Sequence, residues 1–240
     1  MFTQPPSRTP RLTFCSFKGD TSLGQADSCA AWVSSLTILP VHITVDGTNV
    51  YQDVREDYQI ERIDSPGVIL DLGAHIGAFA LYAHELFPDA LIVAVEPDPG
   101  NFAKLTENTA DIKNIVICSA AVTYHRGVAR FISGRDTGGV VASSGDVEVR
   151  AMTLDELMAP FEVISILKAD IEGSEFLAFP ACNLLDRVHY LALEVHLHAR
   201  HEFRKDLWDQ LNTIFELESE VRPVRDDMPG GFEIWRGFHR

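Results

Sequence analysis

Cysteine and positive charge are both scarce in this sequence. The four cysteines are scattered at positions 15, 29, 118 and 182, so they match neither a zinc ligand set nor a dense disulfide framework. The 20 lysines and arginines stand against 35 acids, and the net charge of -15 disfavours long-range attraction to nucleic acid or an anionic membrane. These absences favour a reducing, cytoplasmic location and a small-molecule partner, with no nucleic-acid or membrane partner.

Long hydrophobic runs are also missing. The most apolar window, residues 68–87, is interrupted by two acids and two histidines, which are costly in lipid. Residues 1–11 are rich in Pro, Ser and Thr and lack the apolar stretch of a secretory signal. We therefore expect neither a transmembrane helix nor export. The 46% share of hydrophobic residues is typical of a globular protein.

The pattern of apolar and polar residues changes near residue 66. Residues 1–65 are predicted to form an N-terminal arm and a cap with a hairpin, whose strands at 41–45 and 49–51 flank Asp46-Gly47, a dipeptide that favours tight turns. From residue 66 to 240, short apolar runs alternate with amphipathic stretches, as in βα units around a parallel sheet. We therefore predict one α/β domain behind a small cap.

The apolar runs locate the elements of this domain. Strands are predicted at 68–70, 91–95, 115–118, 163–167 and 191–195, with a two-stranded end at 218–221 and 231–238. Extra strands are predicted at 128–132 and 147–152, flanking a loop at 134–145 that we expect to be mobile. Helices are predicted at 78–87, 101–110 and 205–215.

The strongest motif is the turn D-L-G-A-H-I-G at residues 71–77, which joins the first strand to a helix. Gly73 permits a sharp turn, and Gly77 lets the helix start pack close to the strand. Asp71 would repel the pyrophosphate of a dinucleotide but suits the cationic methionine portion of S-adenosylmethionine (SAM). Glu96 ends the second strand about 25 positions later, near the spacing at which an acid binds ribose hydroxyls. Alternatively, Asp71 caps the turn and Glu96 is an ordinary solvated acid.

A second acidic motif, K-A-D-I-E-G-S-E at residues 168–175, follows a predicted central strand. Asp170 is predicted to lie over the reactive end of the cofactor, where it could orient an incoming hydroxyl or accept its proton. Glu172, Ser174 and Glu175 are alternatively read as helix N-terminal residues stabilised by the helix dipole.

The next strand end carries histidines. His196 is a candidate general base, since Glu194, His196 and His198 share one face if the strand continues that far. His198 and His201 are expected at the surface. Asp170, Glu194 and His196 could alternatively converge on Mg, Mn or Fe, although our preferred interpretation contains no metal.

These motifs together, with E-P-D at 96–98 and E-V-H at 194–196, resemble the FkbM family of SAM-dependent methyltransferases. The resemblance spans about residues 68–198. It implies a Rossmann-like class I fold, in which helices cover both faces of a mostly parallel seven-stranded sheet. It also implies O-methylation of a hydroxyl on a sugar, polyketide or other natural product. His75 departs from the family, which usually has Asn there.

The resemblance also implies site residues. The turn at 71–77 would line the methionine side, Glu96 the ribose and residues 119–121 the adenine edge, while Asn101 helps to fix the second turn. The predicted cofactor-binding residues are Asp71, Gly73, Ala74, His75, Gly77, Glu96, Pro97, Asn101, Ser119, Ala120, Ala121 and Asp170. Asp170 and His196 are the predicted catalytic residues.

Two other functions stay open at this point. An NAD-dependent dehydrogenase is disfavoured because the turn lacks G-x-G-x-x-G spacing and begins with an acid. A catalytically silent module that keeps the cofactor fold as a scaffold is compatible with fold alone, although the intact motifs weigh against it.

Overall fold

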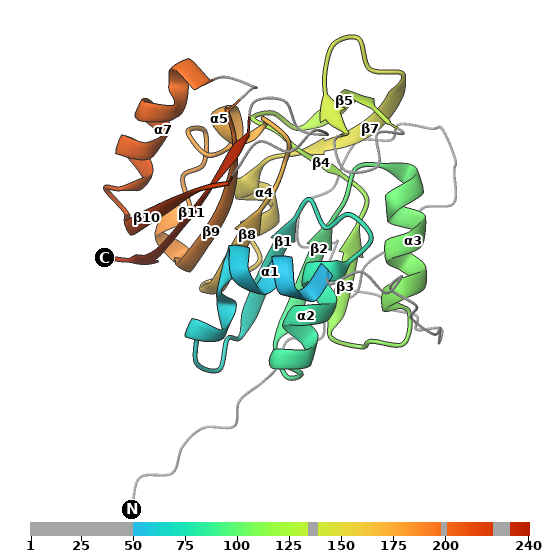
Figure 1. The fold of residues 1–240 in the computed structure, drawn as a ribbon. Coiled ribbons are helices and arrows are strands. Elements are labelled where there is room, and N and C mark those ends of the chain that lie inside the picture. Colours follow the sequence, from blue (N-terminus) through green and yellow to red (C-terminus); the bar gives the residue numbers. More distant parts are fainter. Residues whose placement is uncertain (1–49, 134–138, 198–200, 223–230) are drawn as a thin grey trace, which may run out of the picture.

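The computed structural model describes residues 50–133, 139–197, 201–222 and 231–240 (Figure 1). The predicted hairpin strand at 41–45 and most of the predicted cap lie outside these residues. The second hairpin strand, 49–51, is wrong, because Val50–Tyr58 forms helix α1. The Arg236 guanidinium donates to the carbonyl oxygens of Glu56 (3.0 Å) and Asp57 (2.9 Å), and so satisfies carbonyls at the end of the helix. This tertiary contact is invisible in the local pattern that suggested a strand.

The main sheet confirms the predicted fold class. Its strands are β1 (Val68–Leu72), β2 (Leu91–Val95), β3 (Ile115–Cys118), β8 (Ile164–Ala169), β9 (Val188–His196), β10 (Phe215–Arg222) and β11 (Phe232–His239). Their order is β10-β11-β9-β8-β1-β2-β3. All neighbouring strands are parallel except where β11 pairs with β9 and β10. The predicted two-stranded end is therefore present.

Helices cover both faces of this sheet (Figure 1). One face packs against α1, the 3-10 helix η2 (Ile60–Arg62), α2 (Ala78–Leu86) and α3 (Pro99–Thr109). The other packs against α4 (Leu154–Met158), α5 (Glu175–Ala178), η3 (Leu185–Arg187) and α7 (Arg204–Leu211). A further 3-10 turn, η4 (His201–Phe203), precedes α7. Because α1 and η2 bury side chains in the same core as β1 and α2, residues 54–63 pack as part of the sheet domain.

A second, four-stranded sheet was not predicted as a separate unit. It consists of β4 (Ala121–Val122), β5 (Gly127–Ile132), β6 (Val140–Val141) and β7 (Val147–Met152), in the order β4-β7-β5-β6. Figure 1 shows it at one end of the main sheet. Of the loop expected to be mobile, residues 134–138 lie outside the described residues, and Val140–Val141 pairs with β5. Two of its strands are only two residues long, too short for an alternation pattern.

The topology places a crevice between β1 and β8. The chain runs outward through β2 and β3, passes through the small sheet, and returns to pair β8 with the other side of β1. Ligands of open α/β sheets bind beyond the carboxyl ends of the strands where the order reverses in this way. In the described part of the chain, no helix is long and apolar enough to span a membrane.

Candidate active site

A pocket of about 290 Å³ opens at this crevice. Its lining combines strand ends of the main sheet, the end of α1 and part of the small sheet. The predicted site residues that line it are Gly73, His75, Glu96, Pro97, Asn101, Ala120, Ala121 and Asp170. The topology and the motifs therefore agree on the location.

Gly73 brings two strand ends into close contact. Its φ of +74° is in the left-handed region, and a Cβ added there would lie 1.7 Å from the carbonyl oxygen of Asp170. The Asp170 amide in turn donates to the Leu72 carbonyl over 2.9 Å. The glycine turn after β1 and the acidic turn after β8 are therefore in direct backbone contact and form one wall of the pocket, and a side chain at Gly73 would push them apart.

Glu96 is the buried acid of the pocket. It is 5% exposed, and its carboxylate accepts hydrogen bonds of 2.8 Å from the amides of His75 and Asp98. Burial raises the pKa of Glu96 to about 7, although both amide bonds act to lower it. Glu96 is thus held in place by the first two turns, and the reading of Glu96 as an ordinary solvated acid is wrong.

Asp71 lies beneath the pocket and not in its lining. It is fully buried, and Lys168 Nζ approaches its carboxylate to 3.0 Å. Burial alone would lower the pKa of Lys168, but the carboxylates of Asp71 and Asp170 raise it. A contact of Asp71 with the cofactor stays a prediction, but its charge is already paired with that of Lys168. Asp71 holds Lys168, whose ammonium also donates to the Gly73 carbonyl over 2.7 Å.

Three other predicted cofactor residues are also absent from this lining. Ala74 is 3% exposed and packs in the core, and Ser119 is exposed. Gly77 has a φ of +100°, and a Cβ there would lie 2.8 Å from Leu105 Cδ1. Gly77 therefore allows close packing of the start of α2 against α3, whereas the sequence predicted close packing against the strand. Contacts of these three residues with the cofactor stay predictions.

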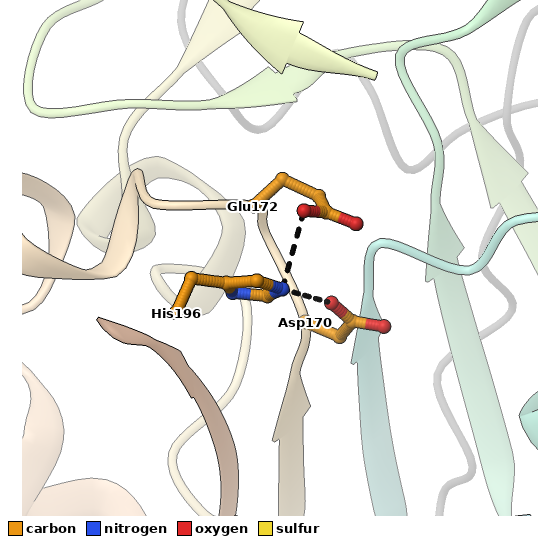
Figure 2. Close-up of side chains that lie close together, drawn as sticks. All are labelled: Asp170, Glu172 and His196. Carbon is orange, nitrogen blue, oxygen red and sulfur yellow. Dashed lines mark ion pairs between the residues drawn. The ribbon is translucent and has the colours of Figure 1, made fainter. Parts of the chain in front are cut away.

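His196 lies at the end of β9 among four carboxylates, as Figure 2 shows for two of them. Its Nε2 is 3.7 Å from Asp170, 3.2 Å from Glu172 and 3.4 Å from Glu194. On the other side of the ring, Glu175 lies 3.2 Å from Nδ1 and accepts the His196 backbone amide over 2.8 Å. Strand β9 reaches His196 and ends there, so the face predicted for Glu194, His196 and His198 is present only for the first two, and His198 lies outside the described residues.

These surroundings bear on the base predicted at His196. Burial alone would lower its pKa, but the hydrogen bond to Glu175 and the nearby carboxylates raise it to about 10. An imidazole that is protonated at neutral pH does not accept a proton, so the carboxylates are the better acceptors. Burial raises the pKa of Glu172 to about 7. A catalytic role for His196 stays a prediction. The raised pKa of His196 disfavours a role as general base.

The comparisons with known proteins agree with this geometry. A sequence profile of the methyltransferase FkbM domain matches residues 71–221. The chain belongs to this family. The crystal structure of precorrin-6y C5,15-methyltransferase from Geobacter metallireducens aligns with a TM-score of 0.52 and 12% identity, over 82% of this chain and 90% of that one. At that identity the likeness shows the fold alone.

Two curated proteins resemble this FkbM-domain chain in part. Hexuronic acid methyltransferase AglP of Haloferax volcanii is 28% identical over 145 residues, which cover 57% of this chain and 59% of the relative. Methyltransferase sdnD of Sordaria araneosa is 35% identical over 68 residues, which cover 28% of this chain and 26% of the relative. The chain therefore spans less than two-thirds of either relative.

Residues 71–221 therefore form a methyltransferase FkbM domain, and SAM is the cofactor that this family implies. The pocket fits this cofactor. Glu96 places two carboxylate oxygens where ribose hydroxyls can donate to them, and Ala120 and Ala121 leave room for a flat base. The family match weighs against the dehydrogenase alternative.

Sequence reasoning missed several lining residues of this FkbM-domain methyltransferase. They are Asp57, Asp98, Val122, Phe131, Gly139, Val141, Ile171 and Phe232. Asp57 escaped notice because the start of α1 was read as a strand and the rest of the helix was assigned to no element. Asp98 could have been found, because Asp followed by Pro is typical of a helix start. Its side chain accepts hydrogen bonds from the backbone amides of Gly100 and Asn101. Phe131 and Val141 come from the small sheet and have no signal in a motif.

Proposed function

We propose that this methyltransferase transfers a methyl group to a hydroxyl of a small molecule, such as a sugar, a polyketide or another natural product. The observation that carries the proposal is the pocket wall at Asp170. There a carboxylate whose side chain is 30% exposed faces the cavity beside Glu172 and Glu194, which also line it. A hydroxyl is a poor nucleophile until a group of this kind accepts its proton.

The residues divide this task between two ends of the pocket. SAM supplies an electrophilic methyl group on a positively charged sulfur. Glu96, with Pro97 and Asn101, holds the nucleoside end, and the turn at Gly73 positions the other end against Asp170. Asp170 orients the acceptor hydroxyl and accepts its proton. Holding the two reactants in alignment accounts for much of the rate enhancement. The close contact between Gly73 and Asp170 supports this alignment, because it fixes the cofactor turn against the carboxylate that orients the acceptor.

The acceptor class is supported from outside the pocket as well. The relative AglP is named a hexuronic acid methyltransferase, which favours a sugar acceptor. We propose no nucleic-acid or membrane partner, in line with the net charge of -15. We also propose that the protein acts in natural product biosynthesis and that it is cytoplasmic. The free thiols of Cys118 and Cys182 suit a reducing compartment.

The proposal is tested by transfer of labelled methyl from SAM to a panel of hexuronic acids, neutral sugars, polyketide alcohols and amines. We expect labelling of a hydroxylated member. Asp170→Asn should lower the rate by roughly 10²–10⁴-fold, the usual contribution of a general base. The matched control is Asp111→Asn, an exposed acid after α3, which should act as the unaltered protein does.

Two results would contradict the proposal. Labelling of the amines alone would replace hydroxyl transfer with N-methylation. Tight SAM binding with no labelled acceptor, in both the unaltered protein and Asp170→Asn, would support the silent scaffold.

A further inference from the structure

We propose that Asp170, Glu172 and His196 form a binding site for a divalent cation of the Mg²⁺ or Mn²⁺ type at the acceptor end of the pocket. The role of the ion in catalysis rests on the proposed function, but its binding does not. The preferred interpretation of the sequence contained no metal. The alternative placed a metal at Asp170, Glu194 and His196, whereas the structure brings Glu172, in place of Glu194, together with the other two.

The geometry suits one ion. A carboxylate oxygen from each acid and an imidazole nitrogen all lie within 4.8 Å of one another. Figure 2 shows both carboxylates directed at the Nε2 atom of His196, which lies 3.7 Å from Asp170 and 3.2 Å from Glu172. An octahedral ion with bonds of about 2.1 Å holds adjacent donors roughly 3 Å apart. Small side-chain rotations therefore suffice to close the three donors around an ion.

A separate observation also points to a ligand here. The Glu194 carboxylate, whose side chain is 8% exposed, also approaches this cluster, and its oxygen lies 3.4 Å from His196 Nε2. In addition, Asp170 Oδ1 is a buried oxygen without a hydrogen-bond partner among the described residues. Buried carboxylate oxygens are costly unless a donor or a cation satisfies them. The lysine beside this cluster, Lys168, is already held by Asp71 at 3.0 Å.

The donor set selects the type of ion. Two carboxylates and one imidazole, without a thiolate, suit Mg²⁺ or Mn²⁺ better than a soft metal. Asp170 and Glu172 both line the pocket, which gives the ion a way in from the cavity. The imidazole is oriented from behind by Glu175, which contacts Nδ1 and leaves Nε2 facing the two carboxylates. Nε2 would bind the ion in exchange for the proton that it carries when no ion is bound, because a metal-bound histidine nitrogen must be deprotonated.

An ion at this position has a clear use. It would bind the acceptor oxygen directly and lower the pKa of the hydroxyl, so that a neighbouring carboxylate can take the proton at neutral pH. It would also fix the oxygen close to the wall that Gly73 and Asp170 form. The cluster would thus act on the acceptor, while Glu96 acts on the cofactor.

The test uses Mn²⁺ with the full chain, without SAM and without an acceptor. Loss of the free Mn²⁺ electron paramagnetic resonance signal during titration counts the bound ions. We expect one ion per chain, bound roughly tenfold or more weakly by Glu172→Gln and by Asp170→Asn. Both substitutions keep the side-chain shape, and circular dichroism checks that each variant is folded. The control is Glu148→Gln, an exposed acid of β7.

The outcomes separate this inference from the proposed function. Absence of saturable binding at one Mn²⁺ per chain would overturn it, and so would equal affinities in Glu172→Gln, Asp170→Asn and Glu148→Gln. Saturable binding that the cluster variants weaken supports the site even if no hydroxyl acceptor is ever methylated. Conversely, hydroxyl methylation by a protein that binds no Mn²⁺ would leave the proposed function standing and this site refuted.

Discussion

Glu96 shows how burial makes a single residue sensitive to pH. Its pKa in the folded chain, about 7, is above that of an exposed glutamate, so its ionisation costs stability as the pH rises from about 4 towards 7. Ribose hydroxyls donate to the ionised form, so binding of SAM favours loss of the proton. We therefore expect SAM to bind more tightly as the pH rises from 6 to 8, by up to about tenfold per unit below 7.

Isothermal titration with SAM at pH 6, 7 and 8 measures this dependence. Glu96→Gln should bind SAM more weakly at pH 8 and lose most of the slope, because it cannot ionise. If Glu96→Gln keeps the full slope, another group controls the pH dependence.

At the scale of elements, β1 and β8 are joined by a buried ion pair. Asp71 and Lys168 are paired in the register of the two strands, and their side chains are 0% and 4% exposed. The Lys168 ammonium also lies 5.5 Å from the centre of the Tyr58 ring, which links it to α1. Removing one partner leaves a buried charge, so Lys168→Met should lower the free energy of unfolding by about 3–5 kcal/mol.

Urea unfolding measures this loss, and the double variant Lys168→Met/Asp71→Leu should recover much of it. The control is Lys205→Met, which removes a pair with Asp209 on the surface of α7 and should cost less than about 1 kcal/mol. Equal losses in the two lysine variants would show that burial of the first pair has no consequence.

At the scale of the whole molecule, one pocket draws on both sheets and on α1. The small sheet contributes Phe131 and Val141, and Ser133 donates to Asp98 over 2.6 Å, which ties that sheet to the start of α3. A ligand that binds only the folded form at about 100 times its Kd adds roughly 2.7 kcal/mol of stability. SAM should therefore slow amide exchange in both sheets together.

Hydrogen exchange with mass spectrometry checks this, by comparing peptides that cover β1, β5 and β7 with and without SAM. Peptides of β10, on the far edge of the main sheet, serve as the internal reference. Protection confined to the β1 turn would show that the small sheet does not take part in binding.

Much of the fold and of the cofactor end could be predicted from the sequence because their signals are local. The runs that became β2 and β3 are apolar over their whole length, as buried parallel strands are, and β1 is apolar except for Asp71. Glycines mark the turn after β1. Gly73 and Glu96 could be singled out because their chemistry depends on their own position at a strand end. The short helix α1 could not be predicted in this way, because it is held by Arg236, which is 179 and 180 positions from its hydrogen-bond partners Asp57 and Glu56.

The sequence by itself therefore determined the parallel sheet, the family and the choice of Glu96 as a pocket acid, since each rests on motifs and apolar runs that are local in the chain. Only the tertiary structure decided that Asp71 forms an ion pair with Lys168 and that Glu172 and Asp170 both lie beside His196. It also decided that the small sheet contributes to the lining of the pocket. The physical reason is that the charge state of a buried group depends on neighbours from other strands. Their distances and burial are set by how the strands pack.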